Sequence, residues 1–227
     1  MSLKNKNPKV SLAIINKNDV IGARYVIPKI KRELFFEIFS VDGGSTDESI
    51  EFFKSENINT VVVNAGGRGG AMRHAAQICK GDYIVYLSTD GEEDANDLGK
   101  FIELFKNGAD MVIASRTAKG AYHKAKSKIT YYHRFLFLKF ITKLINIFFK
   151  GNLTDCWNGY RGFNIKKLKS VDIDAKDFMI EAQQTIRFLK RKYKIFEFPT
   201  HEGNRIAGQS SNPIFKSGIG HLWMLFD

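Results

Sequence analysis

Short apolar runs alternate with longer segments of helical character along the first half of the chain. The strand-like runs cover residues 10–15, 35–41, 60–63, 82–87 and 109–114. Helices are expected between and after them, at residues 23–34, 71–80 and 98–106. Strands that alternate with helices at this spacing predict a mostly parallel central sheet with helices on both faces. The pattern therefore indicates an α/β protein.

Polar residues follow these strands where they end. Asp42-Gly43-Gly44 follows the second strand, and a glycine-rich loop around Arg68 follows the third. Because the carboxyl ends of parallel strands share one edge of a sheet, we expect these residues near a common ligand site. Asp42 could accept a hydrogen bond from the ring N–H of a base. Arg68, just before a helix, could meet a phosphate.

The fourth strand, residues 82–87, runs into small polar residues and then the carboxylates of Asp90, Glu92, Glu93 and Asp94. Hard divalent cations take oxygen ligands, and a metal that also holds phosphates needs only one or two carboxylates. Asp90 and Glu92 are therefore the expected ligands of Mg²⁺ or Mn²⁺. The alternative is a solvated acidic loop that opens a helix, since acids suit a helix N-terminus.

Composition adds a strong positive charge to this picture. The formal net charge is +11 in 227 residues, and no acid lies between Asp110 and Asp155. Such a charge suits nucleic acid, an anionic membrane surface or phosphorylated substrates. The length fits one domain. Cys79 and Cys156 are far apart and lack metal-type spacing, which favours a reducing compartment.

A long helix with a broad apolar surface is expected at about residues 130–150. Its polar stripe consists of Lys139, Thr142, Lys143, Asn146 and Lys150. Two mid-helix lysines would each cost about 2.5–3.5 kcal/mol at a bilayer centre, so the helix is expected to lie in the membrane interface. A core helix packed on the sheet is the alternative, and a helix with one face in each role is compatible with both.

Six polar segments occur in a characteristic order. They are residues 18–19, 41–47, 66–71, 87–92, 155–161 and 205–210. In this order they resemble glycosyltransferase family 2, nucleotide-sugar-dependent enzymes of the GT-A fold, and within it the dolichyl- and polyprenyl-phosphate hexose synthases. The resemblance implies a single GT-A domain at residues 1–211, which includes the basic amphipathic helix, and a short C-terminal tail at residues 212–227.

The resemblance also implies roles for individual residues. Those expected to bind the nucleotide sugar are Asn18, Asp19, Asp42, Arg68, Gly69, Ser88, Thr89 and Asp90. Those expected in catalysis are Asp90, Arg116, Asp155, Arg161 and Glu181. Those expected to bind the acceptor or a phosphate are Arg116, Lys128, Arg134, Arg205 and Ser210. Asp90 and Glu92 remain the expected metal ligands.

The sequence departs from the family pattern at several positions. Ser88 stands where the family has the first acid of its Asp-x-Asp, and Gly43 replaces the second acid of a usual Asp-Asp-Gly. Ile15 replaces the usual proline before the first loop. A serine can ligate or donate a hydrogen bond but brings no charge, so a weaker metal site is expected.

The expected function is inverting transfer of a hexose from a UDP- or GDP-hexose to a polyprenyl phosphate. The protein would be cytoplasmic and peripheral on the cytoplasmic membrane face. A phosphate monoester is already anionic, with a second pKa of about 6, so this acceptor needs no strong base.

Two other functions remain open. One is transfer to a hydroxyl of a cell-surface glycan or lipid-linked saccharide, with Glu181 or Asp155 as the base. The other is a catalytically weakened nucleotide-sugar-binding protein, which Ser88 and Gly43 suggest. Nucleic-acid binding would explain the charge but not the six ordered segments, so no nucleic-acid partner is expected.

Overall fold

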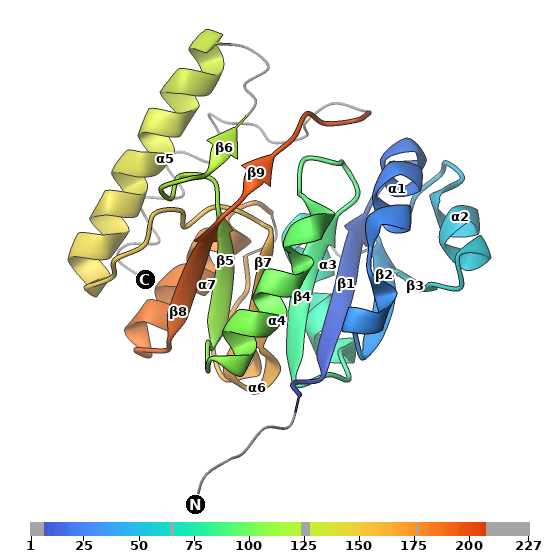
Figure 1. Ribbon diagram of the computed structural model, residues 1–227, viewed down its shortest axis with the longest axis horizontal. Helices are drawn as coiled ribbons and strands as arrows, with labels where there is room; N and C mark the ends of the chain where they lie inside the picture. Colours follow the sequence, from blue (N-terminus) through green and yellow to red (C-terminus); the bar gives the residue numbers. More distant parts are fainter. Residues whose placement is uncertain (1–6, 65, 124–127, 176, 208–227) are drawn as a thin grey trace, which may run out of the picture.

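A seven-stranded sheet forms the centre of the computed structural model, which describes residues 7–64, 66–123, 128–175 and 177–207, with residues 123 and 128–134 as backbone only (Figure 1). The strand order is β3-β2-β1-β4-β7-β5-β8. The strands of this sheet are β1 Val10–Asn16, β2 Glu37–Asp42, β3 Asn59–Val62, β4 Tyr83–Ser88, β5 Met111–Ser115, β7 Arg161–Asn164 and β8 Ile195–Pro199. Only β7 runs antiparallel to its neighbours in this sheet, which confirms the mostly parallel α/β fold.

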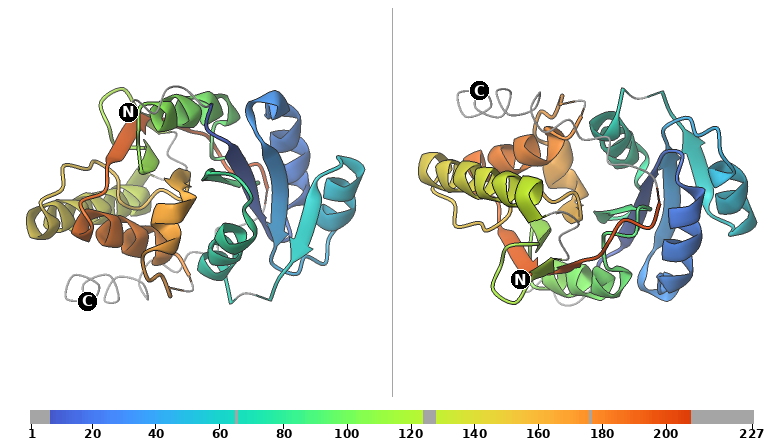
Figure 2. Two further views of the ribbon diagram at one scale, coloured as in Figure 1. Left: turned by 90° about the horizontal axis from the view of Figure 1, so that it is seen from below. Right: turned by 90° about the horizontal axis from the view of Figure 1, so that it is seen from above.

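Helices cover both faces of the sheet (Figure 2). One face carries α1 Val20–Val26, α2 Ser49–Ser55 and α4 Leu98–Lys106. The other carries α3 Arg68–Ile78, α6 Ile165–Lys169 and α7 Ile180–Lys190. Because both faces are covered, β1 is buried along its whole length, as its unbroken apolar sequence predicts.

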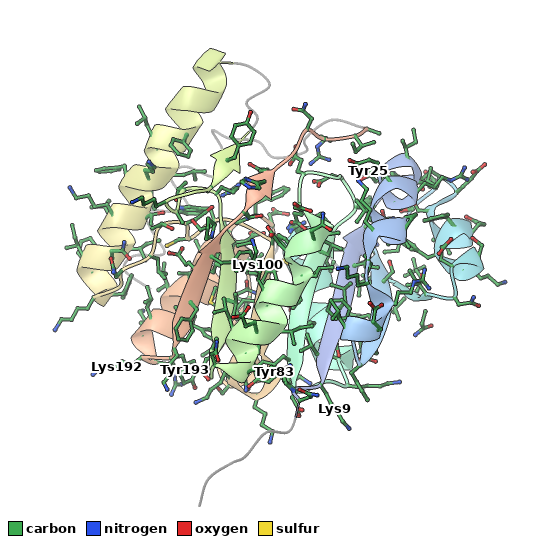
Figure 3. All side chains as sticks on the ribbon, viewed as in Figure 1. Lys9, Tyr25, Tyr83, Lys100, Lys192 and Tyr193 are labelled. Carbon is green, nitrogen blue, oxygen red and sulfur yellow. The ribbon has the colours of Figure 1, made fainter. Side chains whose placement is uncertain are left out.

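The parallel strands start at one edge of the sheet and end at the other. Lys9 and Tyr83 lie where β1 and β4 begin, and Tyr25 of α1 lies near the opposite edge (Figure 3). Register supports this arrangement, since Asn16 pairs with Asp42 and Ile15 with Ser88. The polar residues that follow β1, β2 and β4 therefore meet at one edge.

A small second sheet and three 3₁₀ turns complete the fold among the described residues. The parallel strands β6 Tyr122–His123 and β9 His201–Glu202 form this pair. The 3₁₀ turns are η1 Ile27–Lys29, η2 Arg32–Leu34 and η3 Ala95–Asp97. After β9 the chain crosses above the end of β4 (Figure 1), and there it forms backbone hydrogen bonds from Gly203 to Glu92 and from Ile206 to Asp90.

The helix α5, Lys128–Phe149, packs against α7 outside the sheet (Figure 1). Ile141 and Ile145 are buried in this contact. Two members of the expected polar stripe also face the protein, since Thr142 is buried and Asn146 is hydrogen-bonded to Leu153. The opposite face remains apolar and exposed. No helix in the described ranges is long and apolar enough to span a membrane.

Candidate active site

The loop after β4 is anchored to the loop after β1. Thr89 Oγ1 lies 2.9 Å from Asn16 Oδ1 and 3.1 Å from Asp19 Oδ2. Asp19 also caps α1 by accepting a hydrogen bond from the Gly22 N–H at 3.2 Å. Burial raises the pKa of Asp19 above its ordinary value, although these hydrogen bonds oppose the shift. Asp19 and Thr89, both expected at the donor site, therefore lie in direct contact.

Asp42 is fully buried at the end of β2. It accepts hydrogen bonds from Asn16 Nδ2 at 2.7 Å and from the backbone N–H of Ser45 at 2.6 Å. Asn18 joins the same loop by accepting from the Thr46 N–H at 2.7 Å. Asp42 therefore orders the loop that follows β2, and its expected contact with a base stays a prediction.

Arg68 joins three elements at the same edge. It is the first residue of α3, and its Nε donates to Glu181 Oε1 of α7 at 3.0 Å. Its Nη1 donates to Ser88 Oγ at 2.9 Å. Burial lowers the pKa of Arg68, but the carboxylates of Glu181 and Glu93 outweigh this effect and raise it. Because Gly159 has no Cβ, Arg68 Nη2 can lie against it, 2.0 Å from where a Cβ would stand.

Glu93 belongs to this cluster, although no role was predicted for it from its place in the acidic run after β4. Its Oε2 accepts from the Ser88 N–H at 2.6 Å, and its Oε1 accepts from Ser88 Oγ at 3.2 Å. Arg68 Nη2 lies 3.9 Å from the same carboxylate. Burial raises the pKa of Glu93, Arg68 opposes the shift and the charge of Asp90 adds to it. The acidic run after β4 was the signal that could have identified Glu93.

Both expected metal ligands, Asp90 and Glu92, contact the guanidinium group of Arg205 in the structure. Arg205 Nη2 lies 2.7 Å from Asp90 Oδ2, and Arg205 Nε lies 3.5 Å from Glu92 Oε1. Carboxylate oxygens of both residues therefore converge on a single positive group. Within the described ranges no three Asp, Glu, His or Cys residues form a metal cluster. Two carboxylates suffice when phosphates complete the coordination of Mg²⁺, so the donor set fits such an ion.

The charge balance around the loop after β4 also favours a divalent cation. The ionisable side chains around this loop include Asp90, Glu92, Glu93, Glu181, Arg68 and Arg205. The acidic side chains outnumber the guanidinium groups. This excess of acids favours the binding of a divalent cation.

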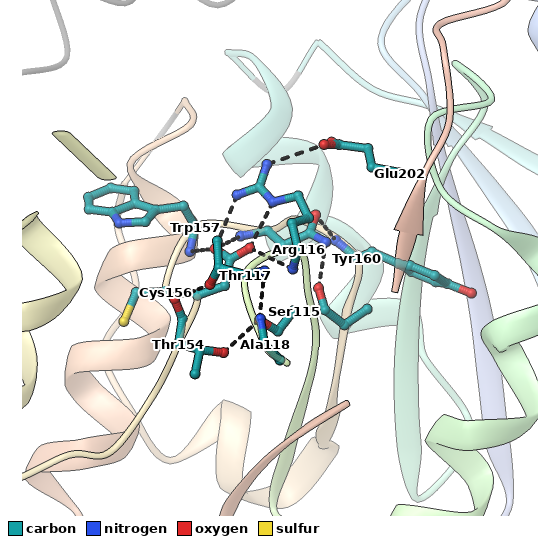
Figure 4. Close-up of polar contacts among 12 residues, drawn as sticks. Ser115, Arg116, Thr117, Ala118, Thr154, Cys156, Trp157, Tyr160 and Glu202 are labelled. Atoms are coloured by element: carbon teal, nitrogen blue, oxygen red, sulfur yellow. Dashed lines mark hydrogen bonds and ion pairs between the residues drawn. The ribbon is translucent and has the colours of Figure 1, made fainter. Parts of the chain in front are cut away.

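Arg116 forms a second charged centre at the end of β5 (Figure 4). Its Nε and Nη2 donate to the two oxygens of Asp155 at 2.7 and 3.1 Å, and its Nη1 lies 3.7 Å from Glu202. Burial lowers the pKa of Arg116, but Asp155 and Glu202 outweigh it and raise the pKa. Burial likewise opposes ionisation of Asp155, yet Arg116 holds the pKa of Asp155 below its ordinary value.

Arg161, which we expected to take part in catalysis, lies in the interior of the protein. Its side chain is fully buried, and it donates to the backbone carbonyls of Asn158 at 2.6 Å, Glu181 at 2.6 Å and Cys156 at 3.0 Å. A guanidinium with these partners cannot reach a substrate without unfolding the segment around it. Arg161 instead holds the segment before β7 against α7.

The structure describes some of the other expected site residues fully, some by their backbone alone and some not at all. Gly69 is buried in the first turn of α3, next to Arg68. Lys128 and Arg134 belong to α5, but their side chains lie outside the described part of the chain. Ser210 and the expected tail at residues 212–227 also lie outside it. The remaining expected side chains lie at the edge where the parallel strands end.

Comparison with known proteins identifies the family of the chain. The family model described as glycosyl transferase family 2 matches residues 17–172. Glycosyltransferase AglJ of Haloferax volcanii is 27% identical over 197 residues, which cover 86% of this chain and 63% of AglJ. An undecaprenyl-phosphate mannosyltransferase of Micrococcus luteus is 27% identical over 135 residues, which cover 57% of this chain and 52% of that protein. The chain thus spans about half to two thirds of these relatives.

Solved structures show the same architecture. Glucosyl-3-phosphoglycerate synthase from Mycobacterium tuberculosis, solved with Mn²⁺, UDP and glucosyl-3-phosphoglycerate, superposes with a TM-score of 0.73. Identity is 16%, and the match covers 96% of this chain and 80% of that one. This likeness shows the GT-A fold. Together with the family match over most of the chain, it establishes that the protein belongs to glycosyltransferase family 2.

Proposed function

We propose that the protein transfers a hexose, with inversion, from a UDP- or GDP-hexose to a polyprenyl phosphate at the cytoplasmic membrane face. The observation that carries this proposal is a pocket between Arg116 and α5. Its lining includes the paired Arg116 and Asp155 on one side and Phe135, Leu138 and Lys139 of α5 on the other. The largely apolar lining matches a polyprenyl chain, and Arg116 and Lys139 are its cationic residues for the phosphate.

The names of two relatives support this acceptor. One is the undecaprenyl-phosphate mannosyltransferase described above, and another is an undecaprenyl-phosphate 4-deoxy-4-formamido-L-arabinose transferase of Pseudomonas savastanoi. The second is 28% identical over 103 residues, which cover 41% of this chain. Both names specify a polyprenyl phosphate as the acceptor, and the sugars differ.

For the donor, we assign the nucleoside to the loops that carry Asn18 and Asp19, and the diphosphate to the loop after β4. Asp90 and Glu92 would hold Mg²⁺ or Mn²⁺, which when bound stabilises the negative charge of the leaving diphosphate. Arg205 already lies on these two carboxylates. It is therefore within reach of a phosphate bound there, and it adds a second positive charge.

The state of the candidate bases favours a phosphate nucleophile. Arg116 engages both oxygens of Asp155, whose lowered pKa makes it a poor proton acceptor. A phosphate monoester needs no such acceptor, because it is anionic already. Transfer to a sugar hydroxyl remains the second candidate, since Glu181 Oε2 is buried with no hydrogen-bond partner among the described residues. In that reaction Glu181 would act as the base.

The decisive experiment supplies purified protein with Mn²⁺ and a UDP- or GDP-hexose, together with either polyprenyl phosphate or a saccharide acceptor. We expect a lipid-linked hexose that is absent with the saccharide and is lost in Asp90→Asn. Glu103→Gln, an exposed change on α4, is the matched control and should retain activity. Product formed only with the saccharide would refute the proposed acceptor. Donor binding without any transfer would favour a nucleotide-sugar-binding protein.

A further inference from the structure

The carboxylate of Glu93 lies directly on the residue that ends β4. Ser88 presents two donors there, its backbone N–H and its hydroxyl, and both are hydrogen-bonded to Glu93 at 2.6 and 3.2 Å. The Glu93 side chain is only 11% exposed. A buried carboxylate held by two donors of one residue has a fixed position. It places a carboxyl group within hydrogen-bond distance of a side chain that has none.

This contact also closes the loop that carries the expected metal ligands. Ser88 and Glu93 are its two ends, and Asp90 and Glu92 lie between them. The loop turns at Gly91, whose φ of 77° is a left-handed conformation that favours glycine. Because a five-residue separation is bridged by two hydrogen bonds, movement of Glu93 would displace both Asp90 and Glu92.

Arg68 connects the same pair to the rest of the site. Its guanidinium donates to Ser88 Oγ at 2.9 Å and lies 3.9 Å from Glu93, while its Nε is bound to Glu181. A carboxylate on residue 88 itself would meet the same guanidinium. A single carboxylate can therefore stand beside Arg68 on either residue 88 or residue 93. Carboxylates on both residues would repel each other.

We propose that Glu93 is a positioning residue that supplies, from five residues further along the chain, the carboxylate that position 88 lacks. It thereby fixes the loop at residues 89–92 for a nucleoside diphosphate and its divalent metal. This inference rests on the proposed nucleotide-sugar donor and does not depend on the acceptor. If the Glu93 carboxylate only stabilised the loop, a carboxylate on residue 88 could not replace it. If the site needs a carboxylate at this point, one on residue 88 should replace it.

The test moves the charge and measures ligand binding by titration calorimetry with UDP and with GDP, in the presence and absence of Mn²⁺. We expect Glu93→Gln to weaken Mn²⁺-dependent binding of the preferred nucleotide by about tenfold or more, since a hydrogen bond to a charged group is lost. Ser88→Asp combined with Glu93→Gln should return it to within about threefold of the wild type. Ser88→Asp alone should weaken binding, because the two carboxylates repel each other.

Thermal unfolding of the same variants distinguishes a folding defect from a binding defect, and Glu103→Gln serves as the exposed control. Wild-type affinity in Glu93→Gln would overturn the inference. So would a double variant that folds like Glu93→Gln but binds no better. If Glu93→Gln does not fold, recovery of folding and binding in the double variant supports the inference, and failure to recover overturns it. A wild type that binds neither nucleotide with Mn²⁺ would refute the proposed donor as well.

Discussion

At the scale of single residues, the buried pair of Asp155 and Arg116 links stability to the site. Asp155 accepts hydrogen bonds from the Arg116 side chain and from the backbone N–H groups of Trp157 and Asn158. Removing one partner of a buried pair leaves the other charge uncompensated. Glu202, 3.7 Å from Arg116, offsets part of that loss. Asp155→Asn is therefore expected to lower the free energy of unfolding by about 3 kcal/mol at neutral pH.

This effect has a defined pH dependence. Because the pKa of Asp155 is lower in the folded protein than in the unfolded chain, its contribution is complete above about pH 4 and is lost as the pH falls through the folded value. Denaturant unfolding should show the difference between wild type and Asp155→Asn shrinking below about pH 4. Asp172→Asn, at an exposed position, is the control and should change stability by less than about 0.5 kcal/mol. A difference that stays constant down to about pH 2 would contradict this account.

At the scale of elements, residues 203–206 after β9 place Arg205 on the expected metal ligands. Backbone hydrogen bonds from Gly203 to Glu92 and from Ile206 to Asp90 fix this segment, at 2.8 and 2.9 Å. A divalent cation at the proposed metal site would therefore have to compete with Arg205 for the same carboxylates. In the absence of nucleotide, we expect Arg205→Ala to bind Mn²⁺ several-fold more tightly than wild type. We expect it to bind the Mn²⁺–nucleotide complex more weakly, because it lacks a positive charge that would pair with the diphosphate.

Calorimetric titration of Mn²⁺, with and without UDP or GDP, measures both effects. Arg24→Ala is a suitable control, because Arg24 is exposed and pairs with Glu48 on the surface of α1 and the loop before α2. Equal or weaker binding of free Mn²⁺ by Arg205→Ala would show that Arg205 and the metal do not compete. Opposite changes in the two titrations distinguish competition from general damage to the site.

The helices and strands differ in how well the sequence predicted them. Strands β1, β4 and β5 were predictable because each is a mostly apolar run, as burial on both faces requires. The antiparallel β7 was not predicted, since it has only four residues and begins with Arg161-Gly162. The helix expected at residues 23–34 ends at Val26, where Pro28 lies in a 3₁₀ turn. The short β7 thus carried too little pattern to be predicted, whereas Pro28 was a local signal for the end of the helix.

Local patterns predicted which loops meet at the site but not how charges pair within them. The edge that gathers Asp19, Asp42, Asp90 and Arg68 follows from parallel topology alone. In contrast, the burial of Arg161 depends on carbonyls of the segment before β7 and of α7, and the contact of Glu93 with Ser88 depends on the turn of the loop between them. Such pairings are set by tertiary packing, which a periodic pattern does not contain.

At the scale of the whole molecule, α5 combines packing with an unusual exposed surface. One face is buried against α7, and the other exposes apolar side chains by 37 to 63% of their surface. These side chains are Leu136, Phe137, Phe140, Ile147 and Phe148. Lys139 and Lys143 are exposed on the same helix, and the chain has a net charge of +11. An exposed apolar face next to lysines is typical of helices that lie in a membrane interface.

We therefore expect the protein to sediment with vesicles that contain anionic lipid, and more weakly with zwitterionic vesicles, because each lysine near an anionic surface contributes about 1 kcal/mol. Replacing Phe140 and Ile147 by Glu should remove most of this binding while leaving thermal unfolding unchanged, since both side chains are more than half exposed. Val62→Glu places one glutamate on a similarly exposed apolar position of β3, far along the sheet from α5, and should bind vesicles nearly like wild type. Equal sedimentation of all three proteins would mean that α5 does not contact lipid, and a polyprenyl phosphate would then have to reach the Arg116 pocket by another surface.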